Sequence, residues 1–402
     1  MTATQADVPD VPYFDLADPS FDVTSEVVHA ARDESWYVHT PYGLAVLRYN
    51  EVGALLKDRR LRQGSAAWPA HNGIHSGLFT DWWNDVLMNL EGEDHHRIRR
   101  LLNPAFSPKV INAMVPQFQA LAEELVDGFV NEGRCEFVSQ FAEPYSARIL
   151  CILLGLPESE WQQISTWAVD LGLSLGVTFA QDLDKIHAAL EGLYGYCNEL
   201  IADRRDNPRD DLTTRLVQAS RDEDRLTETE LAVSLVFLIF AGMDTTRNQL
   251  GLALQTFLRH PDQWAKLAER PELGRAAVEE VMRVNPTITW ITREALEPFT
   301  FQGLEIEQGQ TIQLFSHSAG TDPSAMADTT FDIEGERASH MGFGGGVHHC
   351  LGHFVARTDM SVALPLLARR LRNPRADGPG EWLPMSGNTG PVRFPITFTP
   401  GA

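Results

Sequence analysis

The sequence predicts a mainly α-helical fold, in one large domain that also carries small antiparallel β-sheets. Apolar residues recur at helical spacing along most of the chain up to about residue 295, and again over 351–372. No repeat, low-complexity tract or clear linker divides the 402 residues. We therefore expect a single domain, 1–402, in which the Pro- and Asp-rich residues 1–20 form an irregular lead-in.

Three short segments carry strand patterns. Residues 36–48 place β-forming side chains around a Pro-Tyr-Gly turn, which predicts a hairpin. Residues 296–316 alternate apolar and polar side chains around Gly303 and Gly309, which predicts small antiparallel strands. The sequence FPITF at 394–398 predicts a terminal strand.

Two further segments lack a regular pattern. Residues 62–85 contain Gly, Ser, Pro and Asn together with several tryptophans, and they predict a long aromatic loop. Such a loop is often functional, although aromatic side chains that simply pack on the core explain the composition equally well. Residues 319–346 have few periodic apolar positions, so we expect them to be irregular.

The composition is that of a globular protein with a strong acidic excess. Lys and Arg total 33 and Asp and Glu total 55, so the formal charge is −22, while 43% of the residues are apolar. This excludes a wholly disordered chain. The acidity argues against nucleic acid or an anionic membrane as the main partner.

The cysteines and the apolar runs predict a cytoplasmic protein. The four cysteines, at 135, 151, 197 and 350, show neither a C-x-x-C spacing nor the density of a disulfide scaffold. The first Lys or Arg is Arg32, so we expect no secretory signal. The longest near-apolar run, 231–243, is too short to span a bilayer and predicts a buried helix.

A long helix is predicted over 228–259. Thr227 is followed three residues later by Glu230, which is a capping-box pattern, and no proline occurs before Pro261. The middle of this helix is apolar almost all round, so we expect it to be buried.

The apolar middle of this helix contains the polar sequence Ala241-Gly242-Met243-Asp244-Thr245-Thr246. A buried carboxylate beside hydroxyls is costly unless something satisfies it. One interpretation is a local kink whose polar groups are satisfied internally, since a threonine can bond back to the carbonyl four residues earlier. The other is a notch where a ligand approaches the backbone and where Asp244 and Thr245 relay protons.

A glycine-rich segment leads into a cysteine at the start of the helical pattern of 351–372. It reads Phe343-Gly344-Gly345-Gly346-Val347-His348-His349-Cys350-Leu351-Gly352-His353. Consecutive glycines let a backbone approach something bulky. A helix N-terminus stabilises a thiolate, which is a good metal ligand.

Three kinds of site compete for Cys350. A zinc site with its neighbouring histidines is disfavoured, because adjacent residues do not easily aim at one tetrahedral ion. A catalytic nucleophile is possible, but no Cys-His-Asn signature accompanies it. A thiolate on haem iron explains the glycines, the helix and the single cysteine together.

The cysteine segment resembles the haem-binding loop of the cytochrome P450 family, whose pattern is Phe-x-x-Gly-x-[His or Arg]-x-Cys-x-Gly. Phe343, Gly346, His348, Cys350 and Gly352 match it. Ala241-Gly242 followed by Asp244-Thr245 is similar to the family's oxygen-activating helix. The resemblance runs from about residue 36 to the C-terminus. It implies the cytochrome P450 fold and haem b (iron protoporphyrin IX), with Cys350 as the iron ligand.

Further matches follow in the same order as in the family. Glu280 and Arg283 resemble its Glu-x-x-Arg pair, which is structural; Arg337 takes the place of the arginine that often braces this pair. His95 and Arg99 resemble the family's His-x-x-x-Arg segment. Together with Arg293 and His348, they imply four partners for the haem propionates. Each of the four alone could instead be a surface cation. The cofactor contacts implied by the resemblance are His95, Arg99, Ala241, Gly242, Arg293, Phe343, Gly344, His348, Cys350 and Gly352.

The resemblance also implies a reaction and its partners. Asp244 and Thr245 would organise water and deliver protons while one atom of O2 is inserted into a small, largely apolar organic substrate. Electrons would come from a separate ferredoxin and its ferredoxin reductase. Arg97 and Arg100 could steer that acidic partner, or could be ordinary solvated charges.

The pocket is expected from four segments, and other functions stay open. The pocket segments are 68–83, 171–179, 288–291 and 386–389, which are apolar and aromatic with few charges. The alternatives are another haem-thiolate oxidation, such as coupling, desaturation or a peroxide-driven reaction, and a non-catalytic haem sensor. The acid–alcohol pair favours the oxygen-dependent enzyme, because a sensor needs no proton relay.

Overall fold

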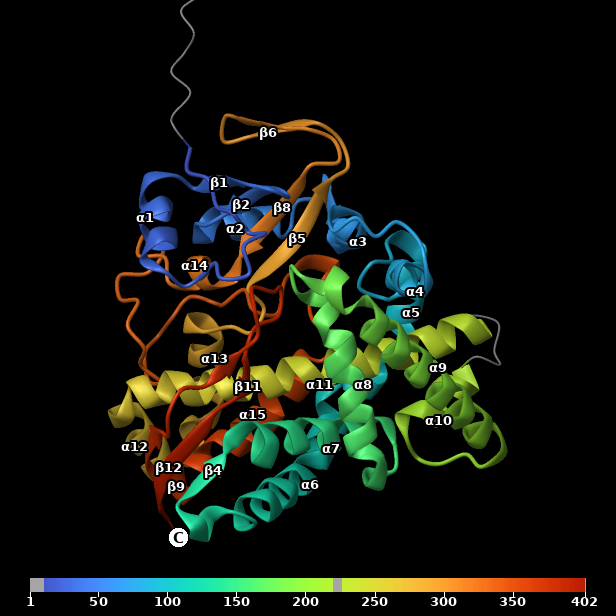
Figure 1. Ribbon diagram of the computed structural model, residues 1–402, viewed down its shortest axis with the longest axis vertical. Coiled ribbons are helices and arrows are strands. Elements are labelled where there is room, and N and C mark those ends of the chain that lie inside the picture. Colours follow the sequence, from blue (N-terminus) through green and yellow to red (C-terminus); the bar gives the residue numbers. More distant parts are fainter. Residues whose placement is uncertain (1–10, 220–225, 402) are drawn as a thin grey trace, which may run out of the picture.

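The computed structural model describes residues 11–219 and 226–401. The main sheet lies at one end of the molecule, a smaller sheet lies near the other end, and helices fill most of the rest (Figure 1). Helix α11 (Glu228–Arg259) runs across the whole width. The helical fold with small sheets is as predicted. Half of the predicted lead-in, residues 1–10, lies outside the described residues, and residues 11–20 contain only turns and one isolated bridge.

The main sheet has five strands in the order β1-β2-β8-β5-β3. Its strands are β1 (Tyr37–Thr40), β2 (Gly43–Val46), β3 (Leu61–Gln63), β5 (Trp290–Ala295) and β8 (Thr311–Phe315). The hairpin predicted over 36–48 is the antiparallel pair β1–β2. The prediction of purely antiparallel strands over 296–316 is wrong in one respect: β8 pairs in parallel with β2 and antiparallel with β5. The partner of β8 comes from far away in the chain, so local alternation could not indicate its direction.

The remaining strands form small antiparallel pairs and one three-stranded sheet. The hairpin of β6 (Phe299–Phe301) and β7 (Leu304–Ile306) projects at the sheet end (Figure 1). The terminal strand predicted over 394–398 is β12 (Pro395–Pro400). It lies between β4 (Arg134–Glu136) and β9 (Leu371–Ala376), and β10 (Glu381–Trp382) pairs with β11 (Pro391–Arg393).

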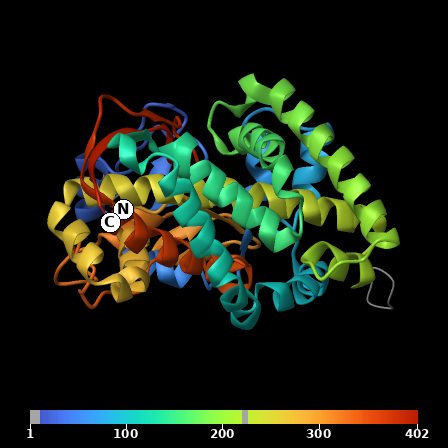
Figure 2. The same cartoon turned by 90° about the horizontal axis from the view of Figure 1, so that it is seen from below.

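Helix α11 has the predicted bounds, and its start is fixed as the sequence indicates. The Thr227 side chain accepts a hydrogen bond from the Glu230 N–H, and the Glu230 side chain bonds back to the Thr227 N–H. The other helices surround it (Figure 2). They are α1 (Glu26–Glu34), α2 (Tyr49–Leu55), α5 (Gly92–Leu102), α6 (Pro108–Asp127), α7 (Glu143–Leu154), α8 (Trp161–Gly172), α9 (Leu183–Asp206), α10 (Leu212–Ala219), α12 (Pro261–Glu269), α13 (Gly274–Val284), α14 (Ser316–Gly320) and α15 (His353–Arg370).

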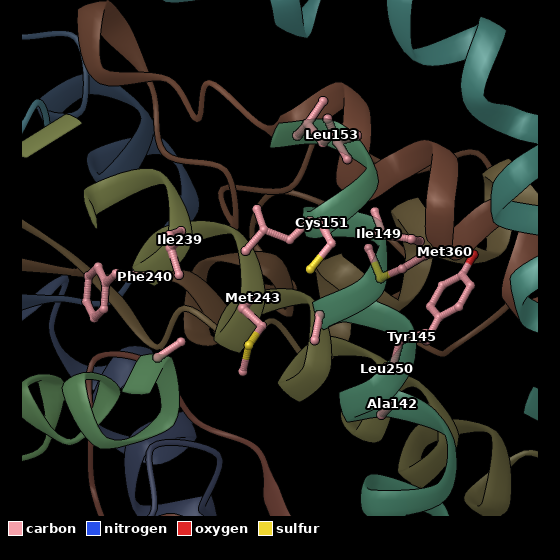
Figure 3. Close-up of a cluster of buried hydrophobic side chains, with 14 of the residues drawn as sticks. Ala142, Tyr145, Ile149, Cys151, Leu153, Ile239, Phe240, Met243, Leu250 and Met360 are labelled. Carbon is pink, nitrogen blue, oxygen red and sulfur yellow. The ribbon is translucent and has the colours of Figure 1, made fainter. Parts of the chain in front are cut away.

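The core lies where α7 packs between α11 and α15. Tyr145 and Ile149 of α7 lie near Met360 of α15, and Met243 lies on the α11 side of the same cluster (Figure 3). The Tyr145 hydroxyl donates to the Asp359 carbonyl at 3.0 Å, so the two helices are also joined by a buried hydrogen bond. This packing fixes α11 relative to α15, and thereby relative to the cysteine segment that precedes α15.

The long loop predicted over 62–85 is wrong. The segment contains β3 and two short helices, α3 (Trp68–His71) and α4 (Leu78–Asp85). Its glycine and proline stand at helix starts: Pro69 is in the first turn of α3, and Gly77, with φ of +120°, precedes α4. Trp82 and Trp83 are buried and pack edge-on against Phe240 of α11, so these aromatic side chains belong to the core.

Among the described residues, α11 is the one helix long and apolar enough to cross a membrane. Its most apolar window is 72% buried inside the protein, however. The helix therefore passes that test as a core helix, as the sequence predicts for 231–243.

Candidate active site

One large cavity brings most of the predicted site residues together. It has a volume of about 370 Å³ and lies between α11, the cysteine segment and the strands of the main sheet. Its wall includes every predicted site residue except one: Arg99, Ala241, Gly242, Asp244, Thr245, Arg293, Phe343, Gly344, His348, Cys350 and Gly352. The exception, His95, lies just behind this wall, with its ring 4.3 Å from that of His348. The rest of the wall is mainly apolar, with contributions from Leu150, Leu153, Phe237, Phe240 and Ile291.

The cysteine segment holds Cys350 through its backbone. The Cys350 N–H donates to the Phe343 carbonyl at 2.9 Å, and the backbone N–H groups of Gly352 and His353 point at the sulfur. Burial raises the pKa of the Cys350 thiol, and these amides and the Arg99 guanidinium oppose that rise. A sulfur placed at a helix N-terminus in this way is suited to bind as a thiolate.

The glycines of this segment have separate tasks. Gly344 and Gly346 adopt φ of +68° and +70°, which few other residues tolerate. Gly344 lines the cavity. Gly345 and Gly346 instead pack against Leu56, where a Cβ would lie 3.5 and 3.2 Å from the nearest atom. The left-handed backbone therefore explains Gly344 and Gly346, and Gly346 also packs closely on the Leu56 carbonyl at the end of α2, whereas a Cβ at position 345 would make only an ordinary contact.

On α11, the polar segment faces the same cavity without breaking the helix. The Thr245 hydroxyl donates to the Ala241 carbonyl at 2.9 Å, so it is satisfied one turn back. Gly242 is exposed although it lies in a buried helix, and it lines the cavity. A Cβ on Gly242 would also lie 2.9 Å from Leu150 Cδ1, so packing on α7 requires a glycine there as well.

Asp244 is buried and heavily bonded. Its Oδ2 accepts hydrogen bonds from Asn388 Nδ2 at 2.6 Å and Asn248 Nδ2 at 3.2 Å, and Arg247 lies 2.5 Å from its Oδ1. Burial raises the pKa of Asp244, and Arg247 and the two amides oppose that rise. A carboxyl with a raised pKa beside a cavity can hold and release a proton.

Cationic side chains gather beside the cysteine segment. Arg293 is 4% exposed and donates to Gln63 Oε1 at 2.6 Å, and burial lowers its pKa to about 10. Arg99 donates to the His349 carbonyl, and His348 Nε2 lies 3.1 Å from Glu91 Oε1. His95 is 1% exposed, and neither of its ring nitrogens has a hydrogen-bond partner among the described residues.

Comparison with known proteins identifies the family. The model of the family described as Cytochrome P450 matches residues 162–377. The chain belongs to the cytochrome P450 family. It is 37% identical over 393 residues to luteothin monooxygenase from Streptomyces thioluteus, which covers 97% of this chain and 96% of that protein.

A second relative and a solved structure are similar to this cytochrome P450 over nine tenths or more of its length. The chain is 32% identical over 371 residues to mycinamicin IV hydroxylase/epoxidase from Micromonospora griseorubida, covering 90% of this chain and 91% of that one. The crystal structure of CalO2 superposes with a TM-score of 0.86 at 27% identity, covering 95% of this chain and 99% of the other. The fold is that of this family, whose members bind haem b (iron protoporphyrin IX), and the protein is a monooxygenase of the oxidoreductase class.

The residues of this cytochrome P450 fit haem. The cavity presents a sulfur, apolar walls and a group of cations, which match the iron, the macrocycle and the propionates. His95 supplies an independent sign: burial lowers its pKa to about 4, and its two nitrogens are orphaned. An imidazole that is buried without a partner is costly, so a further polar group is expected beside it.

Several functional candidates in this cytochrome P450 were missed from the sequence. Asp359 of α15 lines the cavity, one of its carboxyl oxygens has no partner among the described residues, and burial raises its pKa well above the usual range. Asp359 is the one acid of α15 and lies among its mainly apolar buried residues, so it was a usable signal. Asn388 lies in the pocket segment expected over 386–389 and does line the cavity. Its contact with Asp244, and that of Arg247, carried no local signal, because these residues meet Asp244 only in the folded chain.

The Glu-x-x-Arg pair is buried, as the resemblance implied. Arg283 Nη2 lies 2.6 Å from Glu280 Oε1, and Arg283 also donates to the Gly320 carbonyl at 2.8 Å. Arg337 Nε lies 3.6 Å from the same Glu280 oxygen, so Arg337 does brace the pair. These bonds join α13 to the irregular segment that leads to Cys350.

The zinc alternative receives no support from the geometry. In residues 11–219 and 226–401, no three His, Cys, Asp or Glu side chains converge on a point where they could hold a metal ion. The rings of His349 and His353 pack against each other instead, 4.7 Å apart and nearly perpendicular.

Proposed function

We propose that this cytochrome P450 inserts one atom of O2 into a largely apolar organic molecule bound in the cavity, using electrons from a separate ferredoxin and its ferredoxin reductase. One observation carries the proposal: Cys350 and the Asp244–Thr245 pair line a single, mainly apolar cavity. A haem sensor would need the sulfur but has no use for a buried acid and an alcohol at the same cavity.

Each predicted site residue has a proposed role. When bound, haem would supply the oxidising chemistry, and the Cys350 sulfur would hold its iron. The side chains of His95, Arg99, Arg293 and His348 hold the propionates by charge-assisted hydrogen bonds. Flat contact with the macrocycle comes from Ala241, Gly242, Phe343, Gly344 and Gly352, which present small or planar groups to the cavity.

Asp244 and Thr245 move protons in the proposed mechanism. Thr245 keeps its hydroxyl on the Ala241 carbonyl, and rotation about χ1 brings that hydroxyl into the cavity. Asp244, whose pKa is raised by burial, receives protons from outside and passes them on through water. The mainly apolar walls exclude bulk water, so protons reach the cavity chiefly through such groups.

The proposed substrate is a medium-sized, mainly apolar natural-product intermediate. Aromatic and aliphatic side chains form much of the free wall, and its polar groups are mainly hydroxyls and amides, among them Ser65, Gln249, Thr287 and Asn388, together with His71 and Asp359. Two relatives, luteothin monooxygenase and mycinamicin IV hydroxylase/epoxidase, are named for natural products. Such a compound would keep its polar functions near the threonines and amides.

The proposed ferredoxin site is the surface beside the cysteine segment. A shallow hollow there is lined by His96, Arg99, Arg100, Asn103 and Val347, and Val347 is 55% exposed. Of the two arginines proposed to steer that partner, Arg100 lines this hollow and Arg97 does not. Arg97 is bound to Glu230, and this ion pair joins α5 to the start of α11.

The chain is also proposed to act as one cytoplasmic domain over 1–402. The largest buried apolar cluster draws on residues from Phe79 to Phe398, which supports one domain. Three cysteines, at 135, 151 and 197, are buried and unpaired, as is usual in a reducing compartment.

Isotope incorporation tests the proposed reaction. The holoenzyme, a ferredoxin, its reductase and NAD(P)H are incubated under 18O2 with apolar compounds selected by their spectral shift. We expect product that contains one 18O atom. A product without 18O would overturn oxygen insertion and favour coupling or desaturation. Turnover with peroxide but none with the ferredoxin, its reductase and NAD(P)H would overturn the electron route.

A further inference from the structure

The shorter of the two amide hydrogen bonds to Asp244 comes from a distant part of the chain. Asn388 Nδ2 donates to Asp244 Oδ2 at 2.6 Å, and the two residues are 144 positions apart. The other amide donor, Asn248, lies on α11 itself, at 3.2 Å. Because a bond to a charged acceptor is stronger than a neutral one, the short contact with Asn388 contributes much of the restraint on this carboxyl.

Asn388 is itself held in one orientation. It is 2% exposed, and its Oδ1 accepts a hydrogen bond from the Thr287 hydroxyl at 2.6 Å. Its backbone N–H donates to Ser386 Oγ at 3.2 Å, and its backbone bridges to Ile288. The Thr287 hydroxyl also lies 2.7 Å from the Thr389 carbonyl oxygen and is able to accept a hydrogen bond as well as donate one. The orientation of the amide is therefore set by Asp244, because a flipped amide would face its oxygen to the carboxylate.

The residues around this amide form part of the cavity wall. Thr287, Ile288, Gly387 and Asn388 all line the cavity that holds Cys350 and Thr245. The backbone joins them further: the Thr289 N–H donates to the Gly387 carbonyl at 3.2 Å, and the Thr389 N–H to the Thr287 carbonyl at 2.8 Å. We call these four lining residues the amide wall.

We propose that Asn388 is a positioning residue that holds the Asp244 carboxyl and couples it to the amide wall. The proposal rests on the proton-delivery role proposed above for Asp244. A substrate in contact with the amide wall then changes the geometry of the Asn388–Asp244 hydrogen bond. That change alters how easily Asp244 takes up or releases a proton. Proton delivery is in this way linked to occupancy of the cavity.

The electrostatics around Asp244 give the direction of the effect. Arg247 on α11 and the Asn388 and Asn248 amides favour its charged form, whereas burial and Glu143 on α7 oppose it. From α8, the backbone of Gly172 closes the remaining side, where a Cβ would lie 3.2 Å from Oδ2. Loss of the Asn388 donor therefore raises the pKa of Asp244, because one stabilising bond to the carboxylate is gone.

The direct test is an infrared titration of the holoenzyme and its Asn388→Leu variant. The band of the protonated Asp244 carboxyl is identified by its absence in Asp244→Asn. We expect the pH midpoint of this band to rise by about 1–2 units in Asn388→Leu, the equivalent of one hydrogen bond to a charged group. An unshifted midpoint would overturn the proposal.

Steady-state kinetics supply a second readout and a matched control. In Asn388→Leu we expect lower kcat and less product per NAD(P)H, with a pH profile moved upward like the infrared midpoint. Ile288→Val alters the same wall without touching the amide chain, so it is expected to change KM and leave the midpoint in place. Equal midpoint shifts in both variants would contradict a specific role for Asn388.

Two further variants keep the test decisive. If Asn388→Leu does not retain haem, Asn388→Asp preserves the shape and replaces the donor with a second carboxyl. The Asp244 band is then obtained by subtracting the spectrum of the double variant that also carries Asp244→Asn. Its pH midpoint should rise above the wild-type value, because a second carboxyl now faces Asp244, and an unchanged midpoint would overturn the proposal. Full coupling in Asp244→Asn would instead overturn the proton role of Asp244, whatever Asn388 does to its midpoint.

Discussion

Arg293 and Asp359 are two charged or titratable side chains that the fold places at the same apolar cavity. Arg293 lies on a strand of the main sheet and is satisfied in part by Gln63 and the Gly345 carbonyl. Asp359 lies on α15 with one carboxyl oxygen unpartnered among the described residues. The first therefore has a donor to spare for an anion, and the second carries an unrelieved desolvation cost.

The first prediction concerns the propionate contact of Arg293. Arg293→Leu removes a buried cation and should lower haem occupancy several-fold after dialysis against apomyoglobin, because a propionate then faces an apolar side chain. Arg62→Leu on the adjacent strand is the matched control, since Arg62 pairs with Glu294 on the exposed face of the sheet. Equal haem retention in the two variants would contradict the assignment.

The second prediction concerns Asp359 and pH. Burial raises its folded pKa well above the unfolded value of about 3.9, so the folded state binds more protons within that window. The contribution of Asp359 to stability therefore falls as pH rises above about 4. Asp359→Asn removes this dependence, so the variant should gain stability relative to wild type between pH 4.5 and pH 8 in denaturant unfolding. A stability difference that is independent of pH would count against a raised pKa.

At the scale of elements, two helices position the site: α11 carries Asp244, and α15 begins just after Cys350. Helix α13 packs on α15 through Gly274, where a Cβ would lie 2.5 Å from the Ser361 carbonyl oxygen and 2.8 Å from Pro365 Cγ. Close contact at this point sets the distance between the helix that bears Glu280 and the helix that follows Cys350. The glycine is needed for its size rather than for an unusual backbone angle.

Gly274→Ala should accordingly destabilise the protein, by about 1–3 kcal/mol as for other overpacked cores. The matched control is Gly195→Ala on α9, where nothing lies within 4 Å of an added Cβ. That variant should gain up to about 1 kcal/mol from helix propensity. Guanidinium titration of both variants provides the comparison, and a stabilised Gly274→Ala would show that the two helices can separate freely.

The sequence and the structure agree best where information is local. The bounds of α11 follow from a capping box and from the absence of proline before Pro261, and the cysteine segment is one continuous motif. The partners of Asp244 and the parallel pairing of β8 depend on residues far apart in the chain, so no local pattern indicates them. The segment 62–85 was misjudged for a related reason: its glycine and proline start short helices that tertiary packing stabilises.

Over the whole molecule, the charge of −22 contrasts with the basic hollow beside the cysteine segment. A ferredoxin that is acidic at its cluster would be repelled by most of the surface and attracted at this place. Such a charge distribution favours one docking orientation. It raises the association rate more than the affinity, and the effect weakens as the salt concentration rises. The same face leads, through Arg99 and the His349 carbonyl, directly to Cys350.

Arg100→Glu should therefore raise the KM for an acidic ferredoxin several-fold at low ionic strength, and the effect should fade towards physiological salt, where the Debye length is about 8 Å. Arg372→Glu on β9, an exposed arginine away from α5 (Figure 1), makes the same change of charge and is the control. A common effect of both variants would reflect net charge and would contradict docking at the hollow.

The central claim is that Cys350 presents a thiolate to haem iron in the cavity it shares with Asp244 and Thr245. The absorption spectrum of the reduced, carbon monoxide-bound holoenzyme measures this most directly. The account predicts a strongly red-shifted Soret band in the wild type and its loss in Cys350→Ala, while Cys151→Ala on α7 keeps it. A red-shifted band that survives in Cys350→Ala, or a wild-type band without the shift, would contradict it.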